Sequence, residues 1–260
     1  MKRKRAPRWL IAFWIIGFGI LGFRGCYNLK LYLQGGTIVV RTGVHGYYDY
    51  LLHFPKGYYD DSGPRPLILF LHGAGERGRD VSRIQGQDPF YHANGIVDVE
   101  DFPFLVIAPV SPENRWDPEE VIAFLDELLA ERRFRFQIDP NRIYLTGHSM
   151  GGFGTFEIAC KYPNRFAAIV PVAGGSHPKN AVKLLSVPIW AFHGDDDPVV
   201  QIIQTKEIME ELQRFHHPDA RFTILHEWEH GISQPVYSHP DLYRWMLNHE
   251  KTSCNRQFGN

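Results

Sequence analysis

The sequence has few cysteines and no motif typical of a metal site. Its 260 residues include three cysteines, Cys26, Cys160 and Cys254. Three cysteines do not make a disulfide framework, although pairing between Cys26 and Cys254, near the two ends of the chain, remains open. Cys160 is expected to be a buried apolar residue. Since no C-x-x-C or H-E-x-x-H spacing occurs, we expect no metal site and no other cofactor.

The sequence also lacks a large surplus of charge, since its net charge is −1. The charges are unevenly distributed, because residues 1–25 carry six basic residues and no acid, which leaves residues 26–260 with a net charge of −7. Such a balance argues against nucleic-acid binding, which needs a basic surface. The basic cluster is therefore expected to be a targeting signal.

No hydrophobic run reaches the length of a full membrane span. The uncharged run Trp9–Phe23 has fifteen residues, between a signal-peptide core and a spanning helix. Basic residues before such a run keep the N-terminus in the cytoplasm and place the rest outside, on the periplasmic or extracellular side. No A-x-A-like cleavage site follows. We therefore expect residues 1–33 to be a signal anchor that holds the protein at the membrane as a transmembrane helix, with a cleaved export signal as the alternative.

Gly25-Cys26 suggests a bacterial lipoprotein site, but the residues before it argue against lipidation. Phe23 and Arg24 stand where such sites have an aliphatic and a small residue. Behind this segment we expect one globular domain over residues 34–250 and a short tail over residues 251–260, because the chain shows no repeat or low-complexity tract.

Short apolar runs alternate with amphipathic ones along the expected domain. The apolar runs predict eight strands, near residues 37–42, 47–53, 66–71, 104–108, 142–146, 166–172, 188–193 and 221–226. Helices are expected at 117–133, 150–160, 201–215 and 240–249; the first begins with Asp117 as N-cap and Pro118 at the first helical position. This alternation predicts an α/β fold, with a mostly parallel eight-stranded sheet and helices on both faces. About fifteen residues separate the sixth and seventh strands, too few for a large inserted lid.

The most informative motif is Gly147-His148-Ser149-Met150-Gly151. It lies between a strand-like run and an apolar helix-like run, the arrangement of a nucleophile elbow. Glycines two residues either side of Ser149 let the chain turn tightly without side-chain collision. The hydroxyl is then exposed at the start of a helix, whose backbone N–H groups favour a nearby oxyanion.

An exposed serine needs a base oriented by a carboxylate, and folds with this elbow have the order serine, acid, histidine. The acid candidates are Asp195, Asp196 and Asp197, after the seventh strand. We choose Asp197 because it completes His-Gly-x-x-Asp, whereas the other two are expected to face solvent or cap the turn. The alternative is that all three only form a turn.

The base candidates are the histidines late in the chain, His226, His230, His239 and His249. We choose His230 because it lies in the loop after the eighth strand, where a base can reach over the serine. His239 is expected to mark the start of the last helix. The oxyanion hole is expected to use the backbone N–H groups of Met150 and of Ala74, in a glycine-rich loop after the third strand, with Gly75 as the alternative donor.

Four segments together resemble α/β-hydrolases of the carboxylesterase group, which is related to feruloyl esterases, polyhydroxybutyrate depolymerases and dienelactone hydrolases and is often labelled prolyl-oligopeptidase-like. They are LILFLHGAGERG, VIAPVSPENRWDP, RIYLTGHSMGGFGTFEIACKYPNRFAAIVPVAGG and PIWAFHGDDDPVV, and the resemblance spans about Gly46 to Leu247. It implies an α/β-hydrolase fold with Ser149 as nucleophile, Asp197 as acid, His230 as base, and Ala74 with Met150 as oxyanion hole. Dienelactone hydrolases use cysteine as nucleophile, so the serine argues against that activity.

The chain departs from this group around the expected site. Gly231-Ile232-Ser233 stands where related esterases often have Asp-Ser-Trp, and His148 stands where many have leucine. Trp116 matches a tryptophan beside the acyl pocket of the group, although packing at the start of its helix would explain it equally. We expect Trp116 and His148 to border the substrate pocket.

These observations predict a serine hydrolase that cleaves small carboxylic esters through an acyl-enzyme. A peptidase for small peptides is the alternative, but no propeller or other gating domain is present to select peptides by size. A hydrolase fold that serves only as a binding protein is a third hypothesis, and the presence of serine, acid and histidine argues against it. The sequence gives no indication of the oligomeric state.

Overall fold

The computed structural model describes residues 36–40 (backbone only), 48–55, 58, 63–89, 102–131 and 137–251. The predicted anchor over residues 1–33, the cysteines Cys26 and Cys254 and nearly all of the predicted tail lie outside this part of the chain. Within the described residues, no helix has both the length and the apolar character needed to cross a bilayer.

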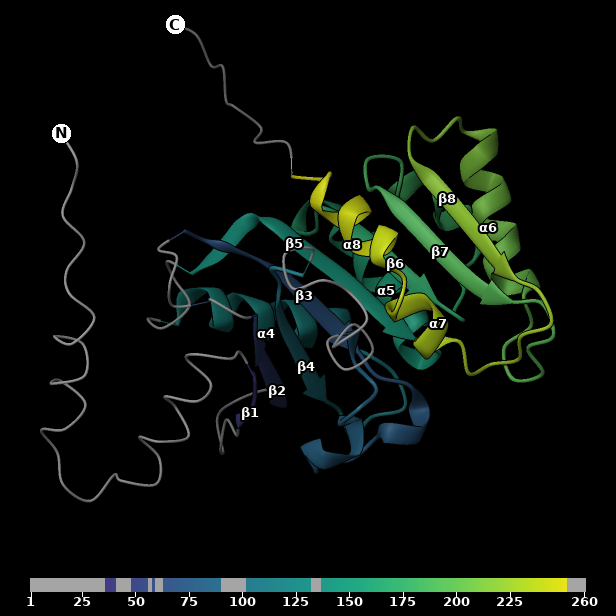
Figure 1. The fold of residues 1–260 in the computed structure, drawn as a ribbon. Helices are drawn as coiled ribbons and strands as arrows, with labels where there is room; N and C mark the ends of the chain where they lie inside the picture. Colours follow the sequence, from purple (N-terminus) through teal and green to yellow (C-terminus); the bar gives the residue numbers. More distant parts are fainter. Residues whose placement is uncertain are drawn as a thin grey trace, which may run out of the picture.

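The centre of the molecule is one eight-stranded sheet in the order β1-β2-β4-β3-β5-β6-β7-β8 (Figure 1). β2 runs antiparallel to β1 and β4, whereas all pairs from β4 to β8 are parallel. The strands are β1 (Gly36–Val40), β2 (Asp49–Phe54), β3 (Arg65–Leu71), β4 (Leu105–Val110), β5 (Ile138–His148), β6 (Ala168–Val172), β7 (Ile189–Gly194) and β8 (Ala220–Leu225). The predicted α/β fold with eight strands is therefore confirmed.

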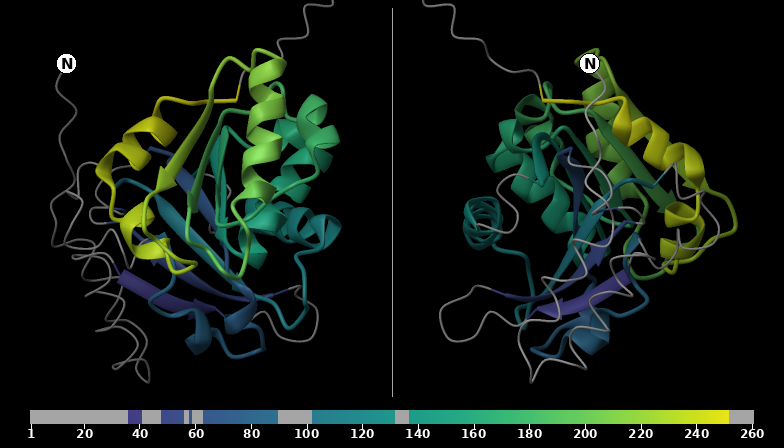
Figure 2. Two further views of the ribbon diagram at one scale, coloured as in Figure 1. Left: turned by 90° about the vertical axis from the view of Figure 1, so that its right-hand side faces the viewer. Right: turned by 60° about the vertical axis from the view of Figure 1, so that its left-hand side comes forward.

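Helices cover both faces of this sheet (Figure 2). α4 (Pro118–Ala130), α5 (Met150–Lys161) and α6 (Ile203–Arg214) lie on one face, and α7 (Ser233–Tyr237) and α8 (Pro240–Leu247) lie on the other. Short 3-10 helices occupy some of the loops: η2 (Ala74–Glu76), η3 (Val81–Ile84), η5 (Pro163–Arg165) and η6 (Pro178–Lys183). Each face of the sheet buries its own apolar core. One core includes Leu145 of β5 and Ile158 of α5, and the other includes Val170 of β6 and Met246 of α8. Because both faces are covered, the central strands read as continuous apolar runs.

The structure refines several predicted boundaries. The first predicted helix ends at Ala130 rather than near residue 133, and its cap is confirmed because the Asp117 carboxylate accepts the N–H groups of Glu119 and Glu120. β5 begins at Ile138, four residues earlier than predicted. The first residues of β5 pair only with β3, because the pairing of β5 with β6 begins at Tyr144. A strand segment with one free edge tolerates a proline, which explains Pro140. α7 was not predicted because five residues show no helical period.

The parallel strands end at the same edge of the sheet, and the predicted catalytic and oxyanion-hole residues follow these ends. The loop with Ala74 follows β3, Ser149 follows β5, Asp197 follows β7 and His230 follows β8. Parallel α/β sheets place their ligand sites at this edge. The fold therefore brings together residues that are up to 156 positions apart in the sequence.

Candidate active site

Ser149 occupies a tight turn between β5 and α5. Its φ of 57° and ψ of −116° are unusual for a residue other than glycine, and its N–H donates to the carbonyl of Val172 at 2.9 Å. A Cβ on Gly151 would lie 1.9 Å from the carbonyl oxygen of Leu71, and one on Gly147 would lie 2.6 Å from backbone atoms of Gly151. The two glycines of the motif are therefore required by close backbone contacts, and the strain is concentrated at the serine.

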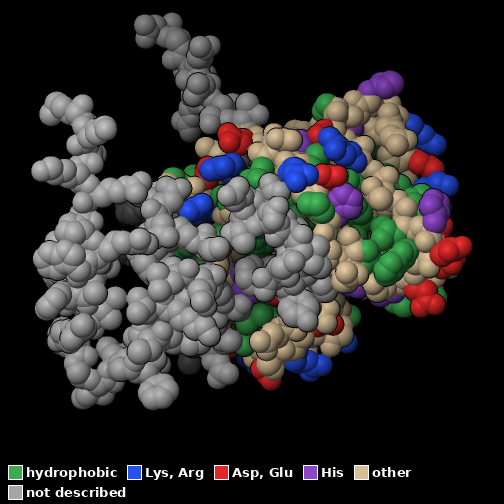
Figure 3. Space-filling view, viewed as in Figure 1, with side chains coloured by type: hydrophobic (Ala, Val, Ile, Leu, Met, Phe, Trp, Pro, Cys, Tyr) green, Lys and Arg blue, Asp and Glu red, His purple; other side chains and the backbone are tan. Residues whose placement is uncertain are grey.

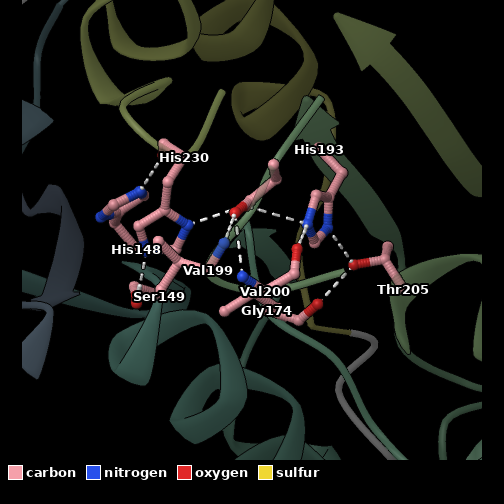
Figure 4. A network of polar contacts seen from close by, with 9 residues as sticks. His148, Ser149, Gly174, His193, Val199, Val200, Thr205 and His230 are labelled. Carbon is pink, nitrogen blue, oxygen red and sulfur yellow. Dashed lines mark hydrogen bonds and ion pairs between the residues drawn. The ribbon is translucent and has the colours of Figure 1, made fainter. Parts of the chain in front are cut away.

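The structure brings together the three side chains that we predicted to form the reactive group, of which Ser149 and His230 are labelled in Figure 4. His230 Nε2 lies 2.8 Å from Ser149 Oγ, and His230 Nδ1 lies 2.7 Å from Asp197 Oδ2. These distances are those of ordinary hydrogen bonds. A serine hydroxyl, an imidazole and a carboxylate connected in this order can pass the hydroxyl proton to the imidazole.

The Asp197 side chain is fully buried, so its charge depends on the groups around it. Its Oδ1 accepts the backbone N–H groups of Val199 and Val200 at 2.8 and 2.9 Å. Burial alone raises the pKa of Asp197, but the hydrogen bonds from His230 and from these two N–H groups outweigh burial and lower the pKa overall. Asp197 is therefore a carboxylate at neutral pH, as an orienting acid has to be.

The other base and acid candidates have different partners. His226 is exposed and pairs with Asp195 at 2.7 Å, and Asp195 also accepts the N–H of Glu227. His239 accepts the N–H of Asp241 at the start of α8, as predicted for a helix cap. His249 lies just after α8, not within it, and binds Asp219 at 2.7 Å.

Sequence reasoning missed a further histidine at this site, His193. Its side chain is completely buried, with Nε2 at 3.3 Å from Asp197 Oδ2 and 2.8 Å from the carbonyl of Val200. Its Nδ1 lies 2.7 Å from Thr205 Oγ1, which in turn donates to the carbonyl of Gly174. The histidine of His-Gly-x-x-Asp was used only to locate the acid, although its place four residues before Asp197 was the available signal.

The loop expected to supply an oxyanion donor is fixed by His72. Its Nδ1 donates to the carbonyl of Gly73 at 2.7 Å, and its Nε2 accepts the N–H of Ser111 at 3.0 Å. Burial lowers the pKa of His72 to about 4, so the ring is neutral and its tautomer is fixed by these two partners. Ala74, at the start of η2, and Met150, at the start of α5, then line the same cavity as Ser149.

A cavity of about 300 Å³ opens at Ser149, and Trp116 forms part of its wall. Trp116 is 1% exposed; its Nε1 donates to the carbonyl of His72, and its side chain packs so close to Gly154 that a Cβ there would lie 2.8 Å away. Trp116 therefore lines this cavity and also packs against its neighbours, and its place beside a bound substrate stays a prediction. The prediction for His148 needs correction, because His148 is not a lining residue of this cavity and turns toward the backbone of His230 instead.

The described residues contain no group of three or more histidine, cysteine or acidic side chains arranged to hold a metal ion. Cys160 is a free thiol, and burial raises its pKa to about 11, so it stays protonated at neutral pH.

Comparisons with known proteins show that this chain is similar to esterases. A model of the phospholipase/carboxylesterase family matches residues 115–237. A bifunctional acetylxylan esterase/xylanase of Neocallimastix patriciarum is 27% identical over 190 residues, which cover 69% of this chain and 26% of that protein. Feruloyl esterase D of Neurospora crassa is 25% identical over 200 residues, which cover 73% of this chain and 67% of that protein.

A solved structure described as a thermostable esterase superposes with a TM-score of 0.64 at 26% identity, covering 84% of this chain and 63% of that one. The chain therefore spans less than two thirds of the length of the bifunctional enzyme and of the thermostable esterase. The three proteins share an esterase name, and the solved structure shares the fold.

Proposed function

Because this chain is an α/β-hydrolase of the carboxylesterase-like group, we propose that it is a serine esterase that hydrolyses carboxylic esters through an acyl-enzyme. The observation that carries the proposal is the hydrogen-bonded series Ser149–His230–Asp197 at the mouth of a cavity. Ser149 is the nucleophile, His230 the general base and acid, and Asp197 the residue that orients His230.

In the first half of the reaction, His230 Nε2 takes the proton of Ser149 Oγ while this oxygen bonds to the ester carbonyl carbon. The carbonyl oxygen becomes an oxyanion, which the N–H groups of Ala74 and Met150 stabilise. When the intermediate collapses, the bond to the alcohol breaks and the alcohol oxygen takes the proton from His230. The acyl group remains on Ser149.

In the second half, His230 takes a proton from water, and the water oxygen attacks the acyl carbon through a second oxyanion. Collapse of this intermediate breaks the bond to Ser149 Oγ, which recovers its proton from His230, and the acid is released. The Asp197 carboxylate stabilises the imidazolium in both halves without itself taking a proton. Each cycle consumes one ester and one water.

We further propose that the substrate carries a polar, uncharged group beyond the ester. A depression of about 980 Å³ shares Arg115, Phe153 and Glu157 with the cavity at Ser149 and runs beside α5. Its charged lining residues are balanced: Arg115, Lys161 and Lys183 against Asp117, Glu119 and Glu157. Such a surface suits hydroxyl groups, which both donate and accept, better than a long alkyl chain. The names acetylxylan esterase and feruloyl esterase among the relatives agree with a polar substrate.

We also propose that residues 1–33 act as a membrane anchor or export signal and that the enzyme works outside the cytoplasm. The support is the basic cluster followed by the apolar run Trp9–Phe23. Fractionation of cells expressing the full chain, with protease added from outside, tests this placement; a protein that stays in the cytosolic fraction would contradict it.

Figure 3 shows basic and acidic side chains interspersed on the face in view, which agrees with a small-molecule substrate rather than nucleic acid.

The proposed activity is tested with the full chain, a fluorophosphonate probe and a panel of esters. We expect the wild-type protein to be labelled and to hydrolyse p-nitrophenyl acetate, and the Ser149→Ala variant to do neither. Faster cleavage of peptide substrates than of every ester would favour the peptidase alternative. For the polar subsite, Lys183→Ala is expected to lower kcat/KM for an acetylated sugar and to leave p-nitrophenyl acetate hydrolysis unchanged. Equal labelling of wild type and Ser149→Ala would refute the proposal.

A further inference from the structure

His148, the residue before the nucleophile, makes a contact that the proposed reaction does not use. Its Nε2 lies 2.8 Å from the backbone carbonyl oxygen of His230, and the two rings are 4.8 Å apart at an angle of 47° (Figure 4). A carbonyl oxygen only accepts, so the proton of this hydrogen bond is on Nε2 of His148. The residue beside the nucleophile therefore holds the backbone of the residue that we propose as base.

The charge state of His148 suits this contact. Burial lowers the pKa of His148 to about 4, so at neutral pH the ring is uncharged and carries its proton on Nε2. The charged and titratable groups that face it are His230, Asp197 and His193. In the proposed reaction His230 becomes positively charged, and a second imidazolium 4.8 Å away would oppose that step. A neutral donor holds His230 without this repulsion.

The loop that carries His230 is fixed differently in its two halves. Asp195 binds His226 and the N–H of Glu227, and the N–H of Asp196 donates to the carbonyl of Trp228, so the first half is attached to the turn after β7. In the second half, a Cβ on Gly231 would have no atom within 4 Å, so this position is loosely surrounded. The His230 carbonyl accepts from Ile232 within the loop and from His148 outside it.

We propose that His148 is a positioning residue: its Nε2–H fixes the backbone of His230 to the elbow, so that the imidazole keeps its hydrogen-bonding distance to Ser149 Oγ. This inference rests on the proposed function. The elbow carries both ends of the arrangement, since His148 and Ser149 are consecutive. A shift of the loop therefore changes both the His148–His230 and the Ser149–His230 contacts. The hydrogen bond from His148 limits how far the His230 imidazole can move away from Ser149 Oγ.

Three substitutions of His148 separate hydrogen-bond donation from bulk. Leucine fills similar space without a donor, the side-chain amide of glutamine reaches approximately as far as Nε2, and asparagine has the same amide one methylene shorter. We expect His148→Leu and His148→Asn to lower kcat for p-nitrophenyl acetate by about 10- to 100-fold, the range for a lost hydrogen bond and a misplaced base. His148→Gln is expected to stay within about threefold of wild type. KM is expected to change less than about twofold in all three, because His148 does not line the cavity.

The rate of Ser149 labelling by the fluorophosphonate is expected to fall together with kcat, because attack of Ser149 on the phosphorus also needs His230 to take the hydroxyl proton. His216→Asn is the matched control: His216 is exposed, has a φ of 53° that asparagine tolerates, and precedes β8, at the edge of the parallel sheet opposite the site. Thermal melting of each variant separates a positioning effect from a folding defect. If His148→Leu does not fold, the comparison of glutamine with asparagine decides.

Wild-type kcat in a folded His148→Leu or His148→Asn variant would overturn the positioning role, as would an equal loss in the glutamine and asparagine variants. These outcomes differ from failure of the proposed function. In that case the wild-type protein and Ser149→Ala behave alike in hydrolysis and labelling, whatever stands at position 148.

Discussion

Replacing Asp197 with asparagine tests the proposed mechanism most directly, because the two side chains differ by one oxygen and one amide nitrogen. The carboxylate has a different partner set on each oxygen. Oδ1 accepts the N–H groups of Val199 and Val200, and Oδ2 accepts from His230 Nδ1 at 2.7 Å. In Asp197→Asn the amide oxygen has to stay on the two backbone donors, because an NH₂ group there would face them. The NH₂ group is therefore directed at His230.

This orientation reverses the hydrogen bond to His230. Its Nδ1 would have to accept, so the proton of the neutral ring would move to Nε2, which faces Ser149 Oγ at 2.8 Å. A ring with that tautomer cannot take the serine proton. Loss of the correct tautomer by this kind of substitution costs about 10⁴-fold in kcat, which corresponds to about 5.5 kcal/mol. We expect kcat/KM for p-nitrophenyl acetate and the rate of fluorophosphonate labelling to fall together by about this factor.

Asp196→Asn is the matched control for Asp197→Asn. Asp196 is the preceding residue, and its side chain is exposed and makes no hydrogen bond or ion pair with the described residues. Its backbone N–H, which the substitution keeps, donates to the carbonyl of Trp228. We expect this variant to keep wild-type activity within about twofold. A folded Asp197→Asn variant that retained more than about a tenth of wild-type activity would refute the tautomer argument and the role of Asp197 with it.

Two further predictions concern stability. Gly151→Ala is expected to lower the free energy of unfolding by more than about 3 kcal/mol, because its Cβ would lie 1.9 Å from the Leu71 carbonyl oxygen. Gly231→Ala is the control and should melt near the wild-type temperature, because its Cβ would have no atom within 4 Å. A soluble Gly151→Ala protein with an unchanged melting temperature would disprove the close contact. Burial alone raises the pKa of Asp219, but hydrogen bonds, first of all the one from His249, outweigh burial and lower this pKa overall. Its stabilising contribution is thus present above the ordinary carboxyl pKa near 4 and lost as pH falls through the lower folded value. Melting curves should show Asp219→Asn about 1 kcal/mol less stable than wild type at pH 7, with a difference that shrinks as the pH falls below the ordinary carboxyl pKa; a difference independent of pH would contradict this.

The parts of the fold that sequence predicts well are those with a strong local pattern. The buried run Pro66–Leu71 predicts a strand because both faces of the sheet are covered there, and Asp117-Pro118 predicts a helix start because cap and proline both act locally. Boundaries that depend on partners are not encoded locally. The start of β5 is set by pairing with Arg65 of β3, and α7 is held by packing of Val236 and Tyr237 under the sheet.

In the site, too, some features follow from neighbouring residues in the sequence and others depend on distant partners. Ser149 is recognisable from its own neighbours, because the glycines that the turn needs are within two residues. Asp197 and His230 are recognisable only through the order of strands, and the structure brings both to the serine. The contact of His148 was not predicted because the His230 carbonyl follows a different strand, and that of His193 was not predicted because it depends on how the chain after β7 turns back to bring the Val200 carbonyl close. Histidine in a motif indicates chemistry more readily than it indicates a structural hydrogen bond.

Close backbone contacts divide the loops of the site into two halves. On one side, a Cβ on Gly151 would lie 1.9 Å from the Leu71 carbonyl, so the turn at Ser149 lies directly against the end of β3, which the loop with Ala74 follows. On the other side, a Cβ on Gly194 would lie 2.2 Å from the carbonyl of Trp228, so the end of β7 lies directly against the loop that carries His230.

The proposed reaction requires Ser149 in one half to stay aligned with His230 in the other. β6 joins them inside the sheet, through its pairing with β5 and β7. At the reactive edge, His230 contacts the elbow through its Nε2, which binds Ser149 Oγ, and through its backbone carbonyl, which accepts from His148 Nε2. Ser149 has to leave its contact when it attacks a substrate, whereas His148 does not. The contact that persists through the reaction is therefore the one that can keep the two halves in register, and its effect should be seen in kcat rather than in stability.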